Sequence, residues 1–203
     1  VPPGQASIDD WPFFPKLIAG VGKHGGRQPR GAGVIAIRGA RNGEGEVACV
    51  CLVEKANGKQ SFPKGGLKKG ETILEGALRE WEEETGIPTG RLTFLEGIIV
   101  DEAKTGCRYL VAECTPSSTD SRTRGPDLLK PQESSWAPPA EDPNDSDPIV
   151  RAHWLSVERV LRGGAHGLVA ERTEMLKRAI GAIRASYSGT KSRAAFTLGS
   201  RRQ

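Results

Sequence analysis

Short runs of β-branched and other apolar residues recur through the middle of the chain, separated by glycine and other turn-forming residues. Residues 34–37 and 47–53 are two such runs, and the polar stretch 41–45 between them has the composition of a turn. Residues 92–100 and 107–114 form a second pair. The pattern predicts two strand pairs that belong to a β-sheet.

A different spacing, with apolar residues three and four positions apart, marks two helices. Residues 72–85 carry one apolar stripe, and residues 168–187 carry another. Thr72 followed by Glu75 has the form of a capping box, and Gly86 is a stop signal. A strand over 149–155 and a short helix over 157–161 precede the second long helix. The order of elements predicts an α/β fold with a mixed sheet.

Three segments lack such periodicity. Residues 1–31 are rich in glycine and proline and are expected to form an extended N-terminal arm. Residues 115–148 are dominated by serine, proline and aspartate and are expected to be a disordered insertion, because they bury too little apolar surface to offset ordering entropy. Residues 188–203 form a basic C-terminal tail that is expected to fray. One domain over residues 32–187 is the prediction.

The composition of the chain bears on its substrate, its partners and its cellular location. The chain of 203 residues has a formal net charge of +4, which suits a highly anionic substrate but does not by itself indicate nucleic acid. No run approaches the roughly 20 apolar residues that cross a bilayer, so no membrane partner is expected. Four cysteines without CxxC spacing favour reduced core thiols and an intracellular location.

The sequence begins with Val1 and contains a single methionine, Met175. We therefore expect that it is not an intact translation product and that either trimming or removal of a targeting segment produced this N-terminus. The basic residues of 23–30 are compatible with a mature end left by organellar import. The cytoplasm, the nucleus and the mitochondrion all stay open as compartments.

Three carboxylates converge near the end of the first long helix. Glu80, Glu83 and Glu84 stand at i, i+3 and i+4 and therefore share one edge of the apolar stripe, whereas Glu82 points toward solvent. Like charges at this spacing destabilise a helix, and the C-terminal end of its dipole prefers cations. A merely solvated face is therefore the weaker interpretation. Clustered hard oxygen ligands suit Mg²⁺, with Mn²⁺ as the alternative.

Arg79 precedes this cluster by one position and is able to orient Glu83 or to reach back to Glu71. At this point the chain resembles the Nudix hydrolases, because seven residues match their signature at every spacing: Gly65, Glu71, Arg79, Glu80, Glu83, Glu84 and Gly86. Trp81 departs from the pattern, since the family usually carries an aliphatic residue there. Altered packing without loss of chemistry is expected from it.

The resemblance implies a fold, a metal site and a reaction. The fold is an α/β/α sandwich with a catalytic loop-helix-loop. The metal ligands are Glu80, Glu83, Glu84 and the Gly65 carbonyl, with Glu71 in support. The reaction is metal-assisted attack of water on a pyrophosphate bond. Glu83, Glu84 and Arg79 carry the catalytic roles. Glu83 is the first candidate for the general base, and an acidic residue from a distant loop is the alternative, namely Glu113, Glu133 or Glu141.

Residues outside the signature must recognise the substrate. Lys64 and Gly66 flank the metal loop, and lysine serves phosphate as a point charge. A broader similarity to diphosphoinositol polyphosphate and dinucleoside polyphosphate hydrolases makes Arg30 and Arg108 further candidate phosphate ligands. Arg108 is equally suited to pair with a carboxylate on a neighbouring strand.

Two other functions stay open on sequence grounds. The basic segments also suit an enzyme that acts on RNA 5′ ends, as in bacterial RNA pyrophosphohydrolases and the trypanosome mitochondrial edited-mRNA stability factor. Trp136 is then the one obvious stacking residue of the insertion. A catalytically silent Nudix-fold scaffold is the second alternative, although intact carboxylates argue against it. No protein partner is predicted, and the scattered histidines His24, His153 and His166 receive no role.

Overall fold

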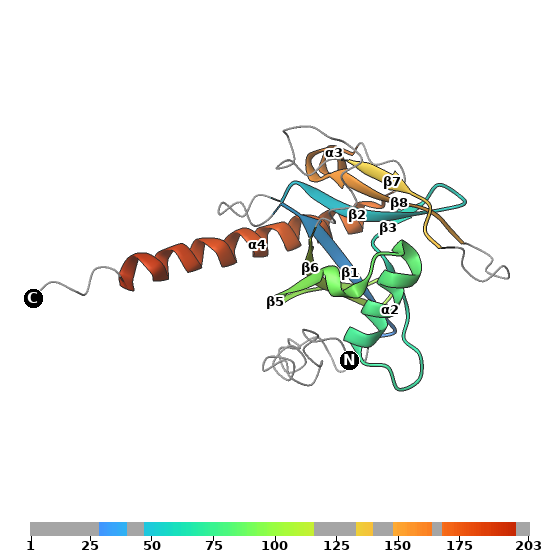
Figure 1. The fold of residues 1–203 in the computed structure, drawn as a ribbon, viewed down its shortest axis with the longest axis horizontal. Helices are drawn as coiled ribbons and strands as arrows, with labels where there is room; N and C mark the ends of the chain where they lie inside the picture. The colour runs from blue at the N-terminus through green and yellow to red at the C-terminus, as the bar shows by residue number, and fades with distance from the viewer. Residues whose placement is uncertain (1–28, 40–46, 116–132, 140–147, 164–167, 198–203) are drawn as a thin grey trace, which may run out of the picture.

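The computed structural model describes residues 29–39, 47–115, 133–139, 148–163 and 168–197. Within them one mixed sheet lies between two long helices, which gives the predicted α/β/α layers (Figure 1). The elements, in chain order, are β1 (Gly31–Arg38), β2 (Cys49–Lys55), β3 (Gln60–Ser61), β4 (Lys64–Gly66), α2 (Ile73–Thr85), η2 (Thr89–Arg91), β5 (Leu92–Glu102), β6 (Cys107–Cys114), β7 (Ser134–Trp136), β8 (Ile149–Ser156), α3 (Val157–Leu161) and α4 (Ala170–Thr197).

Strand β1 lies at the centre of the sheet. The order is β5-β6-β1-β2-β8-β7, with β4 paired to β1 and β3 paired to β2. The predicted antiparallel pairing of the first two runs is confirmed at Ile37 and Val50, and that of β5 with β6 extends from Leu92 to Glu102. The parallel pairing of β1 with β6 was not predicted. The α2 loop-helix-loop lies across one face of this sheet.

Alternate side chains of β1 pack into two separate hydrophobic cores, one on each face of the sheet. Ile35 and Ile37 pack on the face covered by α4, together with Met175, Leu176 and Ile183 of that helix. Val34 and Ala36 pack on the face covered by α2, where the partners are Ala77 and Trp81. A strand buried on both faces explains the continuous apolar run of β1. Trp81 is fully buried, so its large ring is accommodated within the core.

The ends of α2 follow the predicted signals. The side chain of Thr72 accepts a hydrogen bond from the backbone N–H of Glu75, and the Glu75 carboxylate accepts from the backbone N–H of Thr72. Gly86 ends the helix in the left-handed conformation, at φ 68°. The capping box is confirmed, and Thr72 is the cap, one residue before the helix.

Two predictions at the edges of the domain are wrong. Residues 133–139 are not disordered, because β7 forms an antiparallel pair with β8. The predicted end of the last helix at residue 187 is also wrong, since α4 continues to Thr197 and extends away from the sheet (Figure 1). Two parts of the predicted insertion, residues 116–132 and 140–147, lie outside the described residues. So do residues 1–28 of the predicted arm.

All four cysteines are buried, and none of them is in a disulfide bond. Within the described residues, no helix combines the length and the apolar character needed to cross a bilayer.

Candidate functional site

Arg79 is the centre of the carboxylate cluster. Its Nε donates to Glu71 Oε1 at 2.6 Å, and its Nη1 donates to Glu80 Oε1 at 2.6 Å and to Glu83 Oε2 at 2.8 Å. Its Nη2 donates to Glu71 Oε2 at 3.0 Å and to the carbonyl oxygen of Gly66 at 2.9 Å. Both predicted orientations of Arg79 therefore occur together. One guanidinium joins three carboxylates of the loop and helix to the β4 backbone.

Glu71 ties the loop before α2 to this guanidinium. Its carboxylate receives both Arg79 bonds and the backbone N–H of Lys68 at 2.7 Å. The Arg79 hydrogen bonds, followed by that of the Lys68 N–H, lower the pKa of Glu71 to about 2. Glu71 is thus ionised throughout the neutral range and orients Arg79 rather than exchanging protons.

Glu80 packs directly against Gly65. A Cβ on Gly65 would lie 2.2 Å from the Cδ and from both carboxylate oxygens of Glu80, so only glycine leaves room for this contact. Burial raises the pKa of Glu80, and the hydrogen bond from Arg79 only partly offsets that rise. The carboxylate therefore lies in surroundings where further positive charge would stabilise its ionised form.

Glu84 and Glu83 have opposite environments on the same helical turn. Glu84 is buried, and its Oε2 accepts the backbone N–H of Lys64 at 2.8 Å. Glu83 is exposed to solvent, with 49% of its side chain accessible, and lies 3.7 Å from Lys68 Nζ. Glu84 thus fixes β4 to the helix, whereas Glu83 is the member of the cluster most accessible to water. Glu82 is exposed, as expected.

The donor set has the chemistry that a hard divalent cation requires. Three carboxylates surround the single Arg79 guanidinium, so the cluster keeps an excess of negative charge. The contact of Gly65 with Glu80 brings the β4 backbone to the same place. The residues therefore fit Mg²⁺ or Mn²⁺. Across the described part of the chain, no three acidic, histidine or cysteine side chains are already grouped for a metal. Glu80 and Glu83 instead accept hydrogen bonds from Arg79.

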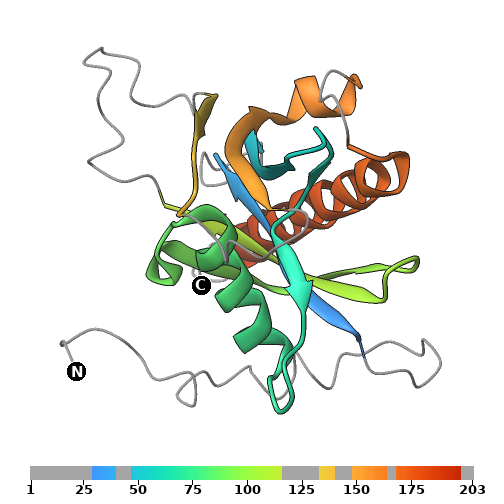
Figure 2. The same ribbon diagram turned by 90° about the vertical axis from the view of Figure 1, so that its right-hand side faces the viewer.

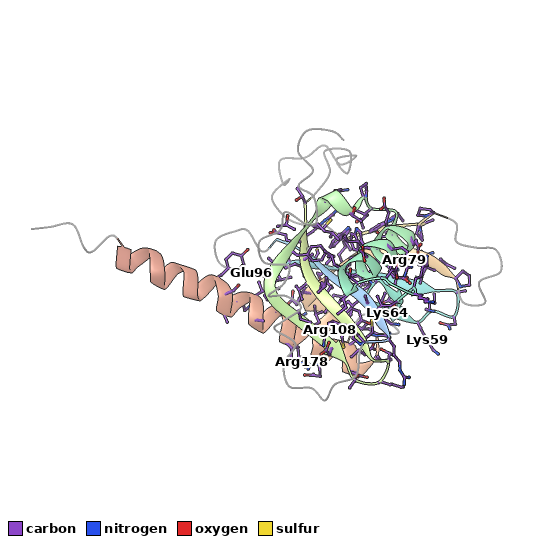
Figure 3. All side chains as sticks on the ribbon, turned by 90° about the horizontal axis from the view of Figure 1, so that it is seen from below. Lys59, Lys64, Arg79, Glu96, Arg108 and Arg178 are labelled. Atoms are coloured by element: carbon purple, nitrogen blue, oxygen red, sulfur yellow. The ribbon has the colours of Figure 1, made fainter. Side chains whose placement is uncertain are left out.

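The candidate phosphate ligands lie around β1. Gly65 of β4 and Arg108 of β6 pair with the same residue, Ala32, from opposite sides. Arg108, which is labelled in Figure 3, donates to Asp101 of β5 through Nε at 2.7 Å and through Nη2 at 3.1 Å. This is the alternative pairing anticipated from the sequence. Lys64 is half-buried beside these strands, and its positive charge helps to lower the pKa of Glu102.

Arg30 and Gly66 are more open. The side chain of Arg30 is exposed, and its backbone carbonyl accepts the N–H of Leu67 at 3.2 Å. Gly66 is exposed, and a Cβ there would meet no atom within 4 Å. Both residues thus lie beside the loop that leads from β4 to α2, with their surfaces accessible to a ligand.

The structure describes two of the three alternative general bases, Glu113 and Glu133. Glu133 accepts the backbone N–H of Ser156 at 2.9 Å and an Arg159 hydrogen bond at 2.8 Å, and the Ser156 bond is the main cause of its lowered pKa. Glu113 is buried on β6. Glu141 lies outside the described residues. The choice of Glu83 as the first candidate stays a prediction.

Several polar residues with defined roles were missed from the sequence. Glu102 is buried beneath α4, where it accepts hydrogen bonds from Arg172, Thr105 and Tyr109. Its alternation with the buried residues Ile98 and Val100 was a usable signal. His153, which received no role, lies 2.9 Å from Glu54. Trp136 donates a hydrogen bond to the Thr85 carbonyl of α2.

A NUDIX domain family model matches residues 27–178. The asymmetrical bis(5′-nucleosyl)-tetraphosphatase of Sus scrofa is 46% identical over 48 residues, which are 23% of this chain and 33% of that protein. The aligned segment thus spans only about a third of that curated relative.

Solved structures of similar chains have low sequence identity. An Ap4A hydrolase from C. elegans has 19% identity and a TM-score of 0.45, with 75% of this chain and 96% of that chain covered. A binary complex of a C. elegans Ap4A hydrolase has 21% identity and a TM-score of 0.49, with 78% and 99% covered. The Nudix hydrolase RenU from M. smegmatis has 15% identity and a TM-score of 0.43, with 84% and 90% covered.

Proposed function

The chain belongs to the NUDIX domain family, and on that premise we propose that it is a divalent-metal-dependent hydrolase that cleaves a phosphoanhydride bond of a dinucleoside polyphosphate. The observation that carries the proposal is the contact of one guanidinium, Arg79, with Glu71, Glu80 and Glu83. Such an arrangement concentrates carboxylate oxygens beside a loop backbone. It suits phosphate chemistry because phosphates reach a carboxylate site through bridging cations.

Each residue of the cluster has a part in the proposed reaction. When bound, the metal supplies neutralisation of phosphate charge and a lower pKa for water. Glu80, Glu83, Glu84 and the Gly65 carbonyl would hold it, while Glu71 fixes Arg79 and Arg79 orients Glu80 and Glu83. Glu83, exposed on the outer edge of the cluster, would accept the proton of the attacking water.

A dinucleoside polyphosphate is the substrate class with the most support. The pig relative, which is 46% identical over its aligned segment, is a bis(5′-nucleosyl)-tetraphosphatase by name. Lys64 and the exposed Arg30 would supply positive charge for a chain of phosphates. Magnesium is the proposed ion, with manganese as its substitute, because both prefer oxygen ligands.

The test is a substrate panel with matched variants. Release of product would be measured with Mg²⁺ for diadenosine tetraphosphate, diphosphoinositol phosphates, 5′-triphosphate RNA, ADP-ribose and nucleoside triphosphates at one salt concentration. Turnover should be fastest with diadenosine tetraphosphate and should be abolished by Glu83→Gln and by Glu84→Gln. Glu82→Gln is the control, because Glu82 lies on the same helix but is exposed outside the cluster.

Other results would redirect or overturn the proposal. Preference for 5′-triphosphate RNA or for diphosphoinositol phosphates would replace the substrate class and leave the chemistry standing. Binding without cleavage of any substrate would favour the scaffold alternative. Undiminished turnover of Glu83→Gln with Mg²⁺ would contradict the assignment of the cluster itself.

A further inference from the structure

The segment of residues 133–139 crosses from one end of the fold to the metal-site helix. Its strand β7 pairs with β8, where Ser134 faces Trp154 and Trp136 faces Ala152. At its start, Glu133 accepts hydrogen bonds from the Ser156 N–H and from Arg159. Ordered pairing at this end therefore fixes where the following residues, including Trp136, can reach.

The far end of the segment contacts the C-terminal turn of α2. The indole Nε1 of Trp136 donates to the backbone carbonyl oxygen of Thr85 at 2.7 Å, across 51 residues of sequence. Pro139 packs on Gly86, where a Cβ would lie 2.7 Å from the proline Cδ. The Trp136 ring also packs against the core beneath α2. Figure 2 shows β7 running down to the end of this helix.

That turn of α2 is electrostatically unfavourable by itself. Glu83 and Glu84 lie in it, and it contains no basic residue to complement the negative end of the helix dipole. The last carbonyl groups of a helix also lack partners within the helix. Gly86 N–H satisfies the carbonyl of Glu82, and the Trp136 indole satisfies that of Thr85, one residue after Glu84. The indole thus supplies a donor where the helix itself supplies none.

We propose that Trp136 is a positioning residue for the metal site: its indole N–H holds the last turn of α2, which carries Glu83 and Glu84, in place beside the other ligands of the cation. The inference rests on the proposed function for its catalytic consequence. Its structural part, the ordering of the turn, stands on the Trp136 to Thr85 bond alone. The donor acts through the backbone and touches no substrate.

The test compares Trp136→Phe, which keeps an aromatic ring but removes the donor, with Ser135→Ala on the exposed side of the same strand. Three quantities would be measured: the Kd for Mn²⁺, kcat and KM for diadenosine tetraphosphate, and amide hydrogen exchange in residues 82–86. Trp136→Phe should weaken Mn²⁺ binding and lower kcat by about fivefold each, the worth of one ordinary hydrogen bond. KM should change by less than about twofold, because no phosphate contact is lost.

Hydrogen exchange should quicken in residues 82–86 of Trp136→Phe and stay at the wild-type rate in Ser135→Ala. Pro139→Ala, which removes less apolar surface, should show a smaller change in the same direction. A lower Tm for Trp136→Phe with unchanged Mn²⁺ affinity and exchange would overturn the proposal, because Trp136 would then only add stability. If the wild-type protein cleaves no substrate, the proposed function fails, while the exchange rates still decide the role of Trp136.

Discussion

The carboxylate of Glu80 occupies the space that any side chain on Gly65 would need. A Cβ at position 65 would lie 2.2 Å from both carboxylate oxygens. Gly65 does not have a positive φ, so its place in the sequence reflects this close approach rather than a left-handed turn. The signature glycine and the signature glutamate are therefore two halves of one contact.

Gly65→Ala should displace the Glu80 carboxylate and weaken Mn²⁺ binding by at least about tenfold, since a shifted ligand no longer meets the geometry the ion requires. Isothermal titration with Mn²⁺, together with kcat, measures the effect. Gly90→Ala is the matched control, because a Cβ there meets no atom within 4 Å. Equal Mn²⁺ affinity in both variants would contradict the role given to the contact.

Arg79→Lys should lower kcat by roughly 10- to 100-fold, the usual effect of losing a residue that orients metal ligands. Lysine keeps the charge but lacks the planar fork that spans Glu71, Glu80 and Glu83. Steady-state kinetics with Mg²⁺ provide the measurement. Lys68→Gln should change kcat by less than about threefold, because its ion pair with Glu83 is long and exposed. Wild-type kcat in Arg79→Lys would show that charge alone suffices.

Features set by neighbouring residues could be predicted from the sequence, whereas contacts between distant residues could not. The helix α2 was predictable because its caps, Thr72 and Gly86, act within a few residues of sequence. The ligands of the cluster were predictable for the same reason, since i, i+3 and i+4 spacing sets their common edge. The parallel pairing of β1 with β6 joins residues about 75 positions apart, for which no local pattern exists.

The ordered structure of residues 133–139 was also not predictable from local sequence. Their composition is polar, and it suggested disorder because it offers little surface to bury. The contacts that order them come from elsewhere in the chain, from Thr85 to Trp136 and from Ser156 to Glu133. Arg108 was an intermediate case, because its partner Asp101 is only seven residues away but lies across a turn between strands.

Arg108→Met should leave KM within about twofold of the wild-type value. The reason is that the Arg108 guanidinium donates two hydrogen bonds to Asp101 and is therefore engaged by a carboxylate of the protein. Asp101→Asn should behave alike, and the double variant should show a coupling of up to about 1 kcal/mol in unfolding free energy. Chemical unfolding and KM for diadenosine tetraphosphate are the measurements. A large rise in KM for Arg108→Met alone would assign phosphate binding to Arg108.

Beneath α4, the fully buried carboxylate of Glu102 forms an ion pair with Arg172. Arg172 Nε donates to Glu102 Oε1 at 2.9 Å, and Arg172 Nη1 donates to the Gln60 carbonyl at 3.2 Å. Arg172→Met should destabilise the fold by about 3–5 kcal/mol, since it leaves a buried charge without its partner. Lys177→Met removes only an exposed ion pair with Glu174 and should cost less than about 1 kcal/mol. Urea unfolding at neutral pH compares the two.

The same carboxylate gives stability a defined dependence on pH. Burial raises the pKa of Glu102, whereas the Thr105 hydrogen bond and the Arg172 charge lower it. The lowering effects together are larger, so the net pKa shift is downward from 4.5. The unfolded chain therefore binds the proton first as pH falls. The stabilisation by Glu102 is complete above its ordinary pKa and is lost between that value and the lower pKa of the folded protein.

Glu102→Gln removes this titration while keeping the shape of the side chain. The difference in unfolding free energy between the wild-type protein and Glu102→Gln should thus shrink steadily as pH is lowered from about 6 to about 3. Urea unfolding across that range measures the difference. A difference that stays constant would mean that folding does not lower the pKa of Glu102, and a difference that grows on acidification would mean that folding raises it. Either result would contradict the assignment of Arg172 as its ion-pair partner.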